Sequence, residues 1–253
     1  MKPIKKTIVI FVLSLIFAIK VYSQELTVAV ASNFQFAMVE IQNEFEQNTN
    51  IKINTVFGSS GKLTVQIQNG APFDLFLSAD MKYPEILFSQ KKTYSIPEVY
   101  AYGSLVLWTK KPIDLTAGIS VLLDKKIKKI AIANPVTAPY GRESLHVLQQ
   151  YQMLEEVKAK LVYARSIAQV NQYVYTKVVD IGFTAKSVVM SQRLLNQGTW
   201  AEIDQTKYTL IKQGVVLLKY GRENHPRESK QFYDFLFSDQ TKRIIKNFGY
   251  RLP

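Results

Sequence analysis

Four times along this chain, a short apolar run ends in small polar residues and is followed by apolar residues at helical spacing. In the first case residues 26–31 lead through Ser32 and Asn33 into residues 34–45. This pattern predicts a β-strand, a tight loop and an amphipathic helix. The other three junctions lie at residues 51–67, 129–151 and 161–178. Strands that alternate with helices predict an α/β fold with parallel sheets, in which ligands bind at the carboxyl ends of the strands.

Each junction places small polar residues at the start of a helix, where backbone N–H groups have no partner within the helix. The helix dipole adds a partial positive charge, so such an end can hold an anion. The same residues are also ordinary helix N-caps, which is the preferred interpretation for any one junction alone. For the four together, an oxyanion site and four independent N-caps are equally supported. The candidate donors are Ser32, Asn33, Ser59, Ser60, Tyr140 and Ser166.

The first 23 residues have the layout of a secretory signal peptide. Lys2, Lys5 and Lys6 precede an apolar run over residues 8–19, and Ser23 provides a small residue at the cleavage position. The run is shorter than the roughly 20 residues that a membrane-spanning helix needs. We therefore expect cleavage after Ser23 and a soluble periplasmic protein.

Composition excludes several classes of site. The chain has no cysteine, so disulfides, thiolate metal sites and a cysteine nucleophile are ruled out. Its formal charge is +12, or +8 without the four leader lysines, and the remaining lysines are dispersed. A nucleic-acid-binding protein would concentrate them on one element, so we expect no nucleic-acid partner. His146 and His225 lack metal-ligand spacing, so we expect no site for a bare metal cation.

Four motifs then occur in an order that is typical of one protein family. They are Val30-Ala-Ser-Asn33, Phe57-Gly-Ser-Ser-Gly-Lys-Leu63, Asn69-Gly-Ala-Pro-Phe-Asp-Leu-Phe-Leu-Ser-Ala-Asp80 and Ala133-Asn-Pro-Val-Thr-Ala-Pro-Tyr-Gly141. In these motifs the chain resembles the molybdate-binding periplasmic proteins, which are the substrate-binding components of molybdate ABC importers. The resemblance covers essentially the whole chain after the leader.

The resemblance implies a type II periplasmic-binding-protein fold, in which two lobes close over a tetrahedral dianion. Each lobe would be a mixed, mainly parallel sheet flanked by helices. We expect residues 24–102 and 209–253 to form lobe 1 and residues 103–208 to form lobe 2. The protein would act as a monomer that binds molybdate, and tungstate as well, and delivers it to a membrane ABC permease. It would need no cofactor and catalyse no reaction.

The resemblance also assigns an oxyanion site, residue by residue. Ser32 and Ser60 match hydroxyl and amide donors, and Ile167 matches a position that gives only its backbone N–H. Tyr140 resembles the tyrosine that one branch of the family uses, whereas the other branch has a binding tyrosine where this chain has Ala185. Asn33 is either a ligand donor or a loop-forming residue. The expected ligands are thus Ser32, Asn33, Ser60, Tyr140 and Ile167.

Charged residues near these loops are expected to stay outside the site. Lys62 and Arg142 flank the loops, but a buried fixed cation would blur selection between oxyanions, so we expect both to be solvated. Asp74 and Asp80 are expected to be structural, because carboxylates near the site would repel the anion. Asp80 is also the expected N-cap of the helix that ends near residue 87.

Two alternatives remain open. The ligand could be another tetrahedral oxyanion, such as sulfate or phosphate, although no loop plainly offers the carboxylate that would accept a proton from phosphate. A secreted hydrolase could instead use Ser32 or Ser60 as its nucleophile. Neither serine lies in a nucleophile-elbow sequence, and no motif links either to a histidine.

Overall fold

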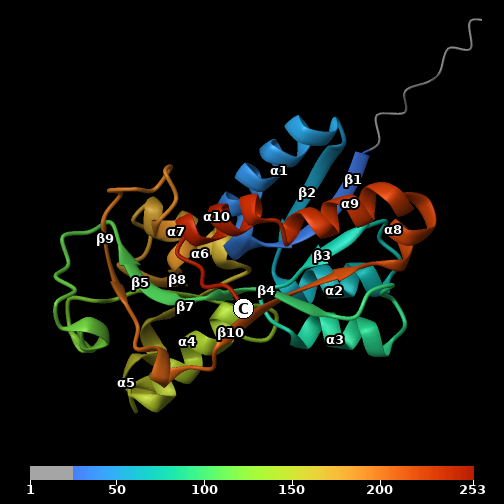
Figure 1. Cartoon of the computed structure of the whole chain (residues 1–253). Helices are drawn as coiled ribbons and strands as arrows, with labels where there is room; N and C mark the ends of the chain where they lie inside the picture. The colour runs from blue at the N-terminus through green and yellow to red at the C-terminus, as the bar shows by residue number, and fades with distance from the viewer. Residues whose placement is uncertain (1–24) are drawn as a thin grey trace, which may run out of the picture.

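Two five-stranded sheets form the centres of two lobes, which lie side by side in Figure 1. The computed structural model describes residues 25–253, so the expected signal peptide lies outside the described residues. Within residues 25–253, no helix is both long and apolar enough to cross a membrane. The predicted two-lobed α/β architecture is confirmed.

The sheet of lobe 1 has the strand order β2-β1-β3-β10-β4. β1 pairs in parallel with β2 and β3, and β10 pairs antiparallel with β3 and β4. Its strands are β1 (Glu25–Ala31), β2 (Lys52–Gly58), β3 (Leu75–Leu77), β4 (Glu98–Gly103) and β10 (Ile211–Leu217). Its helices are α1 (Gln35–Thr49), α2 (Ser60–Gln68), α3 (Lys82–Ser89), α8 (Lys219–Asn224), α9 (Pro226–Leu236) and α10 (Asp239–Asn247).

The alternation of side chains along β1 explains why this strand lies in the middle of lobe 1. Val28 and Val30 belong to a core with α1, α9 and α10, whereas Ala29 belongs to a second core with α2 and α3. All three residues are fully buried. A strand that is apolar on both faces needs helices on both sides of its sheet. In the first core, the rings of Phe45 and Phe232 meet edge to face at 5.0 Å.

The sheet of lobe 2 has the strand order β7-β6-β8-β5-β9. β6 pairs in parallel with β7 and β8, and β5 pairs antiparallel with β8 and β9. Its strands are β5 (Leu105–Thr109), β6 (Ile130–Ala133), β7 (Leu161–Ala164), β8 (Ile181–Ala185) and β9 (Thr199–Glu202). Its helices are α4 (Pro139–Gln150), α5 (Leu154–Val157), α6 (Ile167–Tyr175) and α7 (Lys186–Val189).

The chain passes between the lobes twice. β4 in the first sheet is separated from β5 in the second only by Ser104, and the chain returns from β9 to β10 through a short 3-10 helix (Gln205–Lys207). Near the C-terminus, Arg251 pairs with Tyr102 of β4, which places the chain end beside these crossings (Figure 1). β5 and β10 are antiparallel to both of their neighbours. Each sheet is therefore mixed, with as many antiparallel as parallel pairings, and is not mainly parallel as the resemblance implied.

Several elements differ from the sequence predictions in length. The apolar run over residues 208–220 predicts a long β-strand, but the strand covers only Ile211–Leu217. Residues 113–129 predict a short helix, which is the 3-10 helix Gly118–Leu123. Residues 187–195 predict a helix, of which the structure has only the four-residue α7. The sequence prediction missed β9 and α8, which are short and lack a clear apolar period.

Candidate functional site

A small cavity with mostly buried lining residues lies between the lobes, where the carboxyl ends of β1 and β2 face those of β6 and β7. Its volume is about 10 Å³. That is about the space of one water molecule, so an occupant must shed its hydration shell. The lining residues are Ala31, Ser32, Asn33, Gly58, Ser59, Ser60, Ala79, Ala138, Pro139, Tyr140 and Ile167.

All five sequence-predicted ligand residues line this cavity, and each is at most 4% exposed. Ser32 and Asn33 come from a 3-10 helix (Ser32–Phe34) after β1, and Ser60 begins α2. Tyr140 lies in the first turn of α4, and Ile167 begins α6. Ala185 is buried at the end of β8 but is not one of the lining residues. The structure thus brings four junctions from two lobes to one point.

The helix starts at these junctions are not closed by capping side chains. Ser59 and Ser166 occupy the N-cap positions of α2 and α6, yet neither side chain accepts a bond from its helix. The N-cap positions before the Ser32 helix and α4 are alanines. By contrast, Ser238 caps α10 by accepting from Thr241 N–H. The interpretation as four independent N-caps therefore fails at the cavity.

Backbone N–H groups are left free where these helices begin. Among residues 25–253, no atom accepts a hydrogen bond from the N–H of Ser60, Tyr140 or Ile167. These groups belong to the first turns of helices, where the dipole is positive. Three helix starts with unused donors around a desolvated space form an arrangement suited to an anion.

The Ser60 hydroxyl is oriented for donation. Its Oγ accepts a hydrogen bond from Ala79 N–H at 2.9 Å, and the residue is fully buried. Because a serine hydroxyl has one proton and two acceptor lone pairs, the proton of Ser60 remains available. The Ser32 hydroxyl is less available to donate to a ligand, since it already donates to Gly58 O at 3.1 Å.

Two buried hydroxyls at the cavity have no partner among the described residues, those of Ser59 and Tyr140. A buried polar group without a partner costs about 1–3 kcal/mol, so an acceptor in the cavity would remove this cost. Ser59 was not among the predicted ligands. Its position beside Ser60 was visible in the sequence, but there it could not be told from an N-cap.

Tyr140 fits because β4 ends in a glycine. A Cβ at Gly103 would come within 2.1 Å of the Tyr140 hydroxyl. Burial raises the pKa of Tyr140 well above its ordinary value, so its hydroxyl stays protonated and can donate.

The side-chain amide of Asn33 is already hydrogen-bonded within the protein. Its Nδ2 donates to Gln213 Oε1 at 2.7 Å and to Tyr250 Oη at 3.1 Å. The backbone carbonyl oxygen of Asn33 accepts from Ser187 Oγ of lobe 2 at 2.8 Å. Of the two roles left open by the sequence, the structure favours that of a loop-forming residue, which ties the first junction to β10 and to lobe 2.

Arg142 is paired with a carboxylate, which the sequence did not predict, although its side chain is 37% exposed. Its guanidinium donates to the Asp80 carboxylate at 2.6 Å, which links α4 of lobe 2 to lobe 1. The prediction that Asp80 is the N-cap of the following helix is wrong: Met81 is the N-cap of α3, although the Asp80 carboxylate accepts from Tyr83 N–H at 3.4 Å. The pair was invisible in the sequence because its members are 62 residues apart. Lys62 is exposed, as expected.

Two further bonds join the lobes next to this ion pair. Gly61 N–H donates to Thr137 O at 2.8 Å, and the Tyr83 hydroxyl donates to Val136 O at 3.0 Å. No charged side chain is among the residues that line the cavity in the described part of the chain. The cavity therefore offers neutral donors only, and the flanking Arg142 is paired with Asp80.

Asp74 is structural, in line with the sequence prediction. It is fully buried, accepts from Thr27 N–H at 2.6 Å and contacts His225 Nδ1 at 2.8 Å. Thr27 lies near the start of β1, away from the cavity at its end. Over residues 25–253, no three histidine or acidic side chains gather as a metal site would require.

A buried tyrosine network beside the cavity predicts a loss of stability in alkali. Burial raises the pKa of Tyr250 to about 12, although hydrogen bonds with Ser187, Asn33 and Gln213 lower it. Below pH 10 the hydroxyl is protonated in both the folded and the unfolded chain. Above pH 10 the unfolded chain loses this proton first, so the free energy of unfolding should fall by about 2 kcal/mol for this group by pH 12.

Urea titrations at intervals between pH 8 and pH 12 measure this loss. The variant Tyr250→Phe should be less stable at pH 8, because it removes the hydrogen bonds of the Tyr250 hydroxyl with Asn33 and Ser187. Its free energy of unfolding should then fall less steeply than that of the unchanged protein between pH 10 and pH 12. Parallel curves for the two proteins would contradict the assignment.

Comparisons with known proteins agree with the geometry. Residues 26–251 match the sequence model of a family described as bacterial extracellular solute-binding protein. The chain is 39% identical to the molybdate-binding protein ModA of Azotobacter vinelandii over 229 residues, which cover 90% of each chain. It is 35% identical to ModA of Rhodobacter capsulatus over 229 residues, covering 89% of this chain and 88% of the relative.

A solved structure extends the comparison to three dimensions. The periplasmic molybdate-binding protein of Azotobacter vinelandii superposes with a TM-score of 0.85 at 32% sequence identity. The match covers 90% of this chain and 99% of the solved chain. The similarity therefore extends over both lobes.

Proposed function

Since this chain belongs to the bacterial extracellular solute-binding proteins, we propose that it captures molybdate between its lobes and delivers it to an ABC permease. The family transports solutes and is not a family of enzymes, so the hydrolase alternative is set aside. The observation that carries the proposal is the small cavity between the lobes, whose lining supplies unused neutral donors from both of them.

The proposed ligand set divides by the kind of donor. Ser60 gives its hydroxyl and backbone N–H, Ile167 gives its N–H, and Tyr140 gives both its hydroxyl and its N–H. Ser59 adds a hydroxyl, and Ser32 adds one if its bond to Gly58 O is exchanged for the ligand. Asn33 contributes at most through its backbone, because its amide is already engaged. Hydrogen bonds from such dipoles to a charged acceptor are the strong ones.

Selection between oxyanions would rest on the spacing of these donors. Sulfate has shorter bonds than molybdate, so donors held on two lobes could not all reach its oxygens at good hydrogen-bonding distance. Tungstate is nearly the same size as molybdate and should bind as well. Phosphate carries a proton near neutral pH and needs an acceptor, which the lining residues do not supply as a carboxylate.

The lobes are proposed to hinge at their two connections. Residues 24–102 and 209–253 would move as lobe 1 and residues 103–208 as lobe 2. The single residue between β4 and β5 and the short segment before β10 support this division. Closure would bring Ser60 and Tyr140 onto the same anion. The protein would act as a monomer in the periplasm, after removal of residues 1–23.

Calorimetric titration of the leader-free protein tests this function. Molybdate and tungstate should bind with one anion per chain and about 100-fold more tightly than sulfate or phosphate. The size difference between oxyanions makes sulfate the matched control, since its charge is the same. No heat with molybdate, or equal affinity for sulfate, would contradict the proposal.

A further inference from the structure

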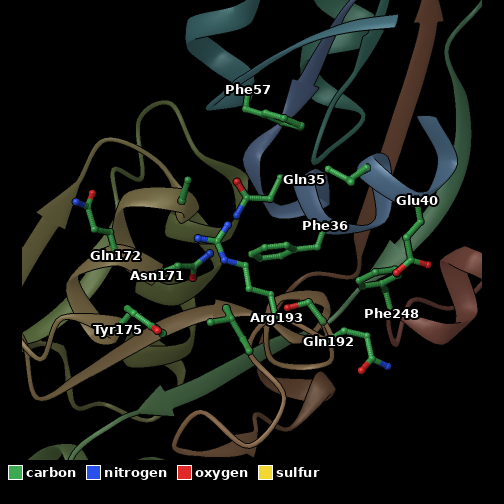
Figure 2. Close-up of a pocket in the computed structure, with 14 residues that line it drawn as sticks. Gln35, Phe36, Glu40, Phe57, Asn171, Gln172, Tyr175, Gln192, Arg193 and Phe248 are labelled. Atoms are coloured by element: carbon green, nitrogen blue, oxygen red, sulfur yellow. The ribbon is translucent and has the colours of Figure 1, made fainter. Parts of the chain in front are cut away.

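A second and much larger hollow lies between the lobes, on the side of α1 and α6. Its volume is about 640 Å³, and its walls are α1, Phe57 and Phe248 from lobe 1 and α6 and residues 191–194 from lobe 2 (Figure 2). The oxyanion cavity lies at the starts of the same two chain segments, because Asn33 precedes α1 and Ile167 begins α6. We call this hollow the α1–α6 groove.

A buried amide in the α1–α6 groove lacks an acceptor. Asn171 of α6 is 6% exposed, and its Oδ1 accepts from the Thr184 hydroxyl at 2.5 Å. Its Nδ2 has no partner among residues 25–253 and belongs to a side chain that lines the groove. Since a buried donor without an acceptor is costly, this amide marks where a ligand oxygen would be favourable.

A guanidinium lies at the same end of the groove. Figure 2 shows the Arg193 guanidinium beside the Asn171 amide and the Gln35 side chain. No carboxylate of the described residues forms an ion pair with Arg193. The one carboxylate of the lining, Glu40, lies on the far side of Phe36 in this view. The Arg193 guanidinium and the Asn171 amide lie beside each other in this view and both line the groove. A carboxylate suits them, because a guanidinium binds it in a planar fork.

Much of the rest of the groove is apolar, although Glu40, Gln172, Ser191 and Gln192 also line it. Phe36, Phe57 and Phe248 line it, and Val39 and Tyr175 are each 48% exposed. Pockets of about 300–1,000 Å³ with apolar walls and a few converging polar groups are typical of sites for small organic molecules.

We propose that the α1–α6 groove binds a small organic carboxylate with an aromatic or branched apolar body. The carboxylate accepts from Arg193 and from Asn171 Nδ2, and the body packs against Phe36 and Phe57. Because its walls come from both lobes, the bound molecule favours their closed arrangement. It therefore raises the affinity for the oxyanion, and the oxyanion raises its affinity by the same factor. This coupling rests on the proposed oxyanion function, whereas the groove itself does not.

An NMR titration of the leader-free protein with 3-phenylpropionate tests the groove. The expected result is saturable binding, with chemical-shift changes in α1, α6 and residues 191–194. The uncharged amide of the same acid should bind at least about 10-fold more weakly, because it cannot pair with Arg193. Absence of saturable binding, or shifts confined to other parts of the chain, would overturn the proposal.

Two arginine variants sharpen the test. Arg193→Gln should weaken binding of 3-phenylpropionate by about 10-fold or more, which is the loss of one charge-assisted contact. Arg243→Gln removes an exposed arginine of α10 outside the groove and should leave the affinity unchanged. Equal affinity of the acid and its amide, or equal effects of the two substitutions, would overturn the assignment of the carboxylate.

The coupling is measured in the presence of saturating molybdate. The affinity for 3-phenylpropionate should then rise by about 5-fold or more. An unchanged affinity with molybdate shown to be bound would overturn the coupling and leave the groove as a separate site. If molybdate itself does not bind, the proposed function fails while the titrations without molybdate still decide the groove.

Discussion

Replacing Ser60 by alanine should weaken molybdate binding by about 100-fold, the largest effect of any single hydroxyl in the cavity. A hydrogen bond to a charged acceptor contributes about 1.5–3 kcal/mol, and Ser60 is the serine whose proton is already free to donate. The substitution also leaves Ala79 N–H without its acceptor, so the free energy of unfolding should fall as well. Calorimetry gives the affinity, and urea denaturation gives the stability.

The matched control for this experiment is Ser166→Ala. Ser166 is a serine at the start of another helix of the site, as the N-cap residue of α6, but its side chain caps nothing and does not line the cavity. Its removal should change the affinity by less than about 3-fold. An equal loss in both variants would mean that serines at these junctions act through local helix structure. An unchanged affinity in Ser60→Ala would remove Ser60 from the ligand set.

Replacing Gly61 by alanine should weaken molybdate binding by about 10- to 100-fold without removing any ligand donor. A Cβ at this position would lie 2.7 Å from the Tyr83 hydroxyl and 3.0 Å from Thr137 Cα of the opposite lobe. Lobe 2 would have to move away, which breaks two hydrogen bonds between the lobes, each contributing about 0.5–1.5 kcal/mol. Lobe 1 itself should fold normally, since the obstruction lies at its surface.

Small-angle scattering separates this effect from the loss of a donor. At saturating molybdate, Ser60→Ala should still become as compact as the unchanged protein, whereas Gly61→Ala should stay more extended. Lys62→Ala is the control, because Lys62 is the exposed neighbour in the same helical turn. Normal affinity and full compaction in Gly61→Ala would show that the close approach at Gly61 is not needed for binding.

The four strand–loop–helix junctions were predictable because their signals are local. Apolar runs and helical periods within about 20 residues predicted the ends of β1, β2, β6 and β7, and these ends meet at one cavity. The role of each residue within a junction was harder to predict from the sequence. Ser59 and Ser60 are adjacent in the sequence, and only the bond from Ala79 N–H distinguishes them.

Contacts between distant segments could not be predicted from the sequence. The side-chain amide of Asn33 donates hydrogen bonds to Gln213 and Tyr250, which lie 180 and 217 residues away in the sequence. Arg142 is neutralised by a carboxylate of the other lobe, so its solvation could not be judged from its neighbours in the chain. The contacts of Asn33 and Arg142 depend on how distant segments of the two lobes pack together, which cannot be predicted from a local sequence pattern.

The cavity lining carries no charged side chain, so the groups that attract anions from a distance differ from the groups that select among them. The field of a dipole falls off faster with distance than that of an ion, so backbone donors act only on an anion that has already entered. The paired charges of Arg142 and Asp80 largely cancel at a distance. Attraction from afar therefore comes from the dispersed surface lysines, whose influence is screened beyond about 8 Å at physiological ionic strength. Added salt should slow the arrival of every anion alike and leave the discrimination among them almost unchanged.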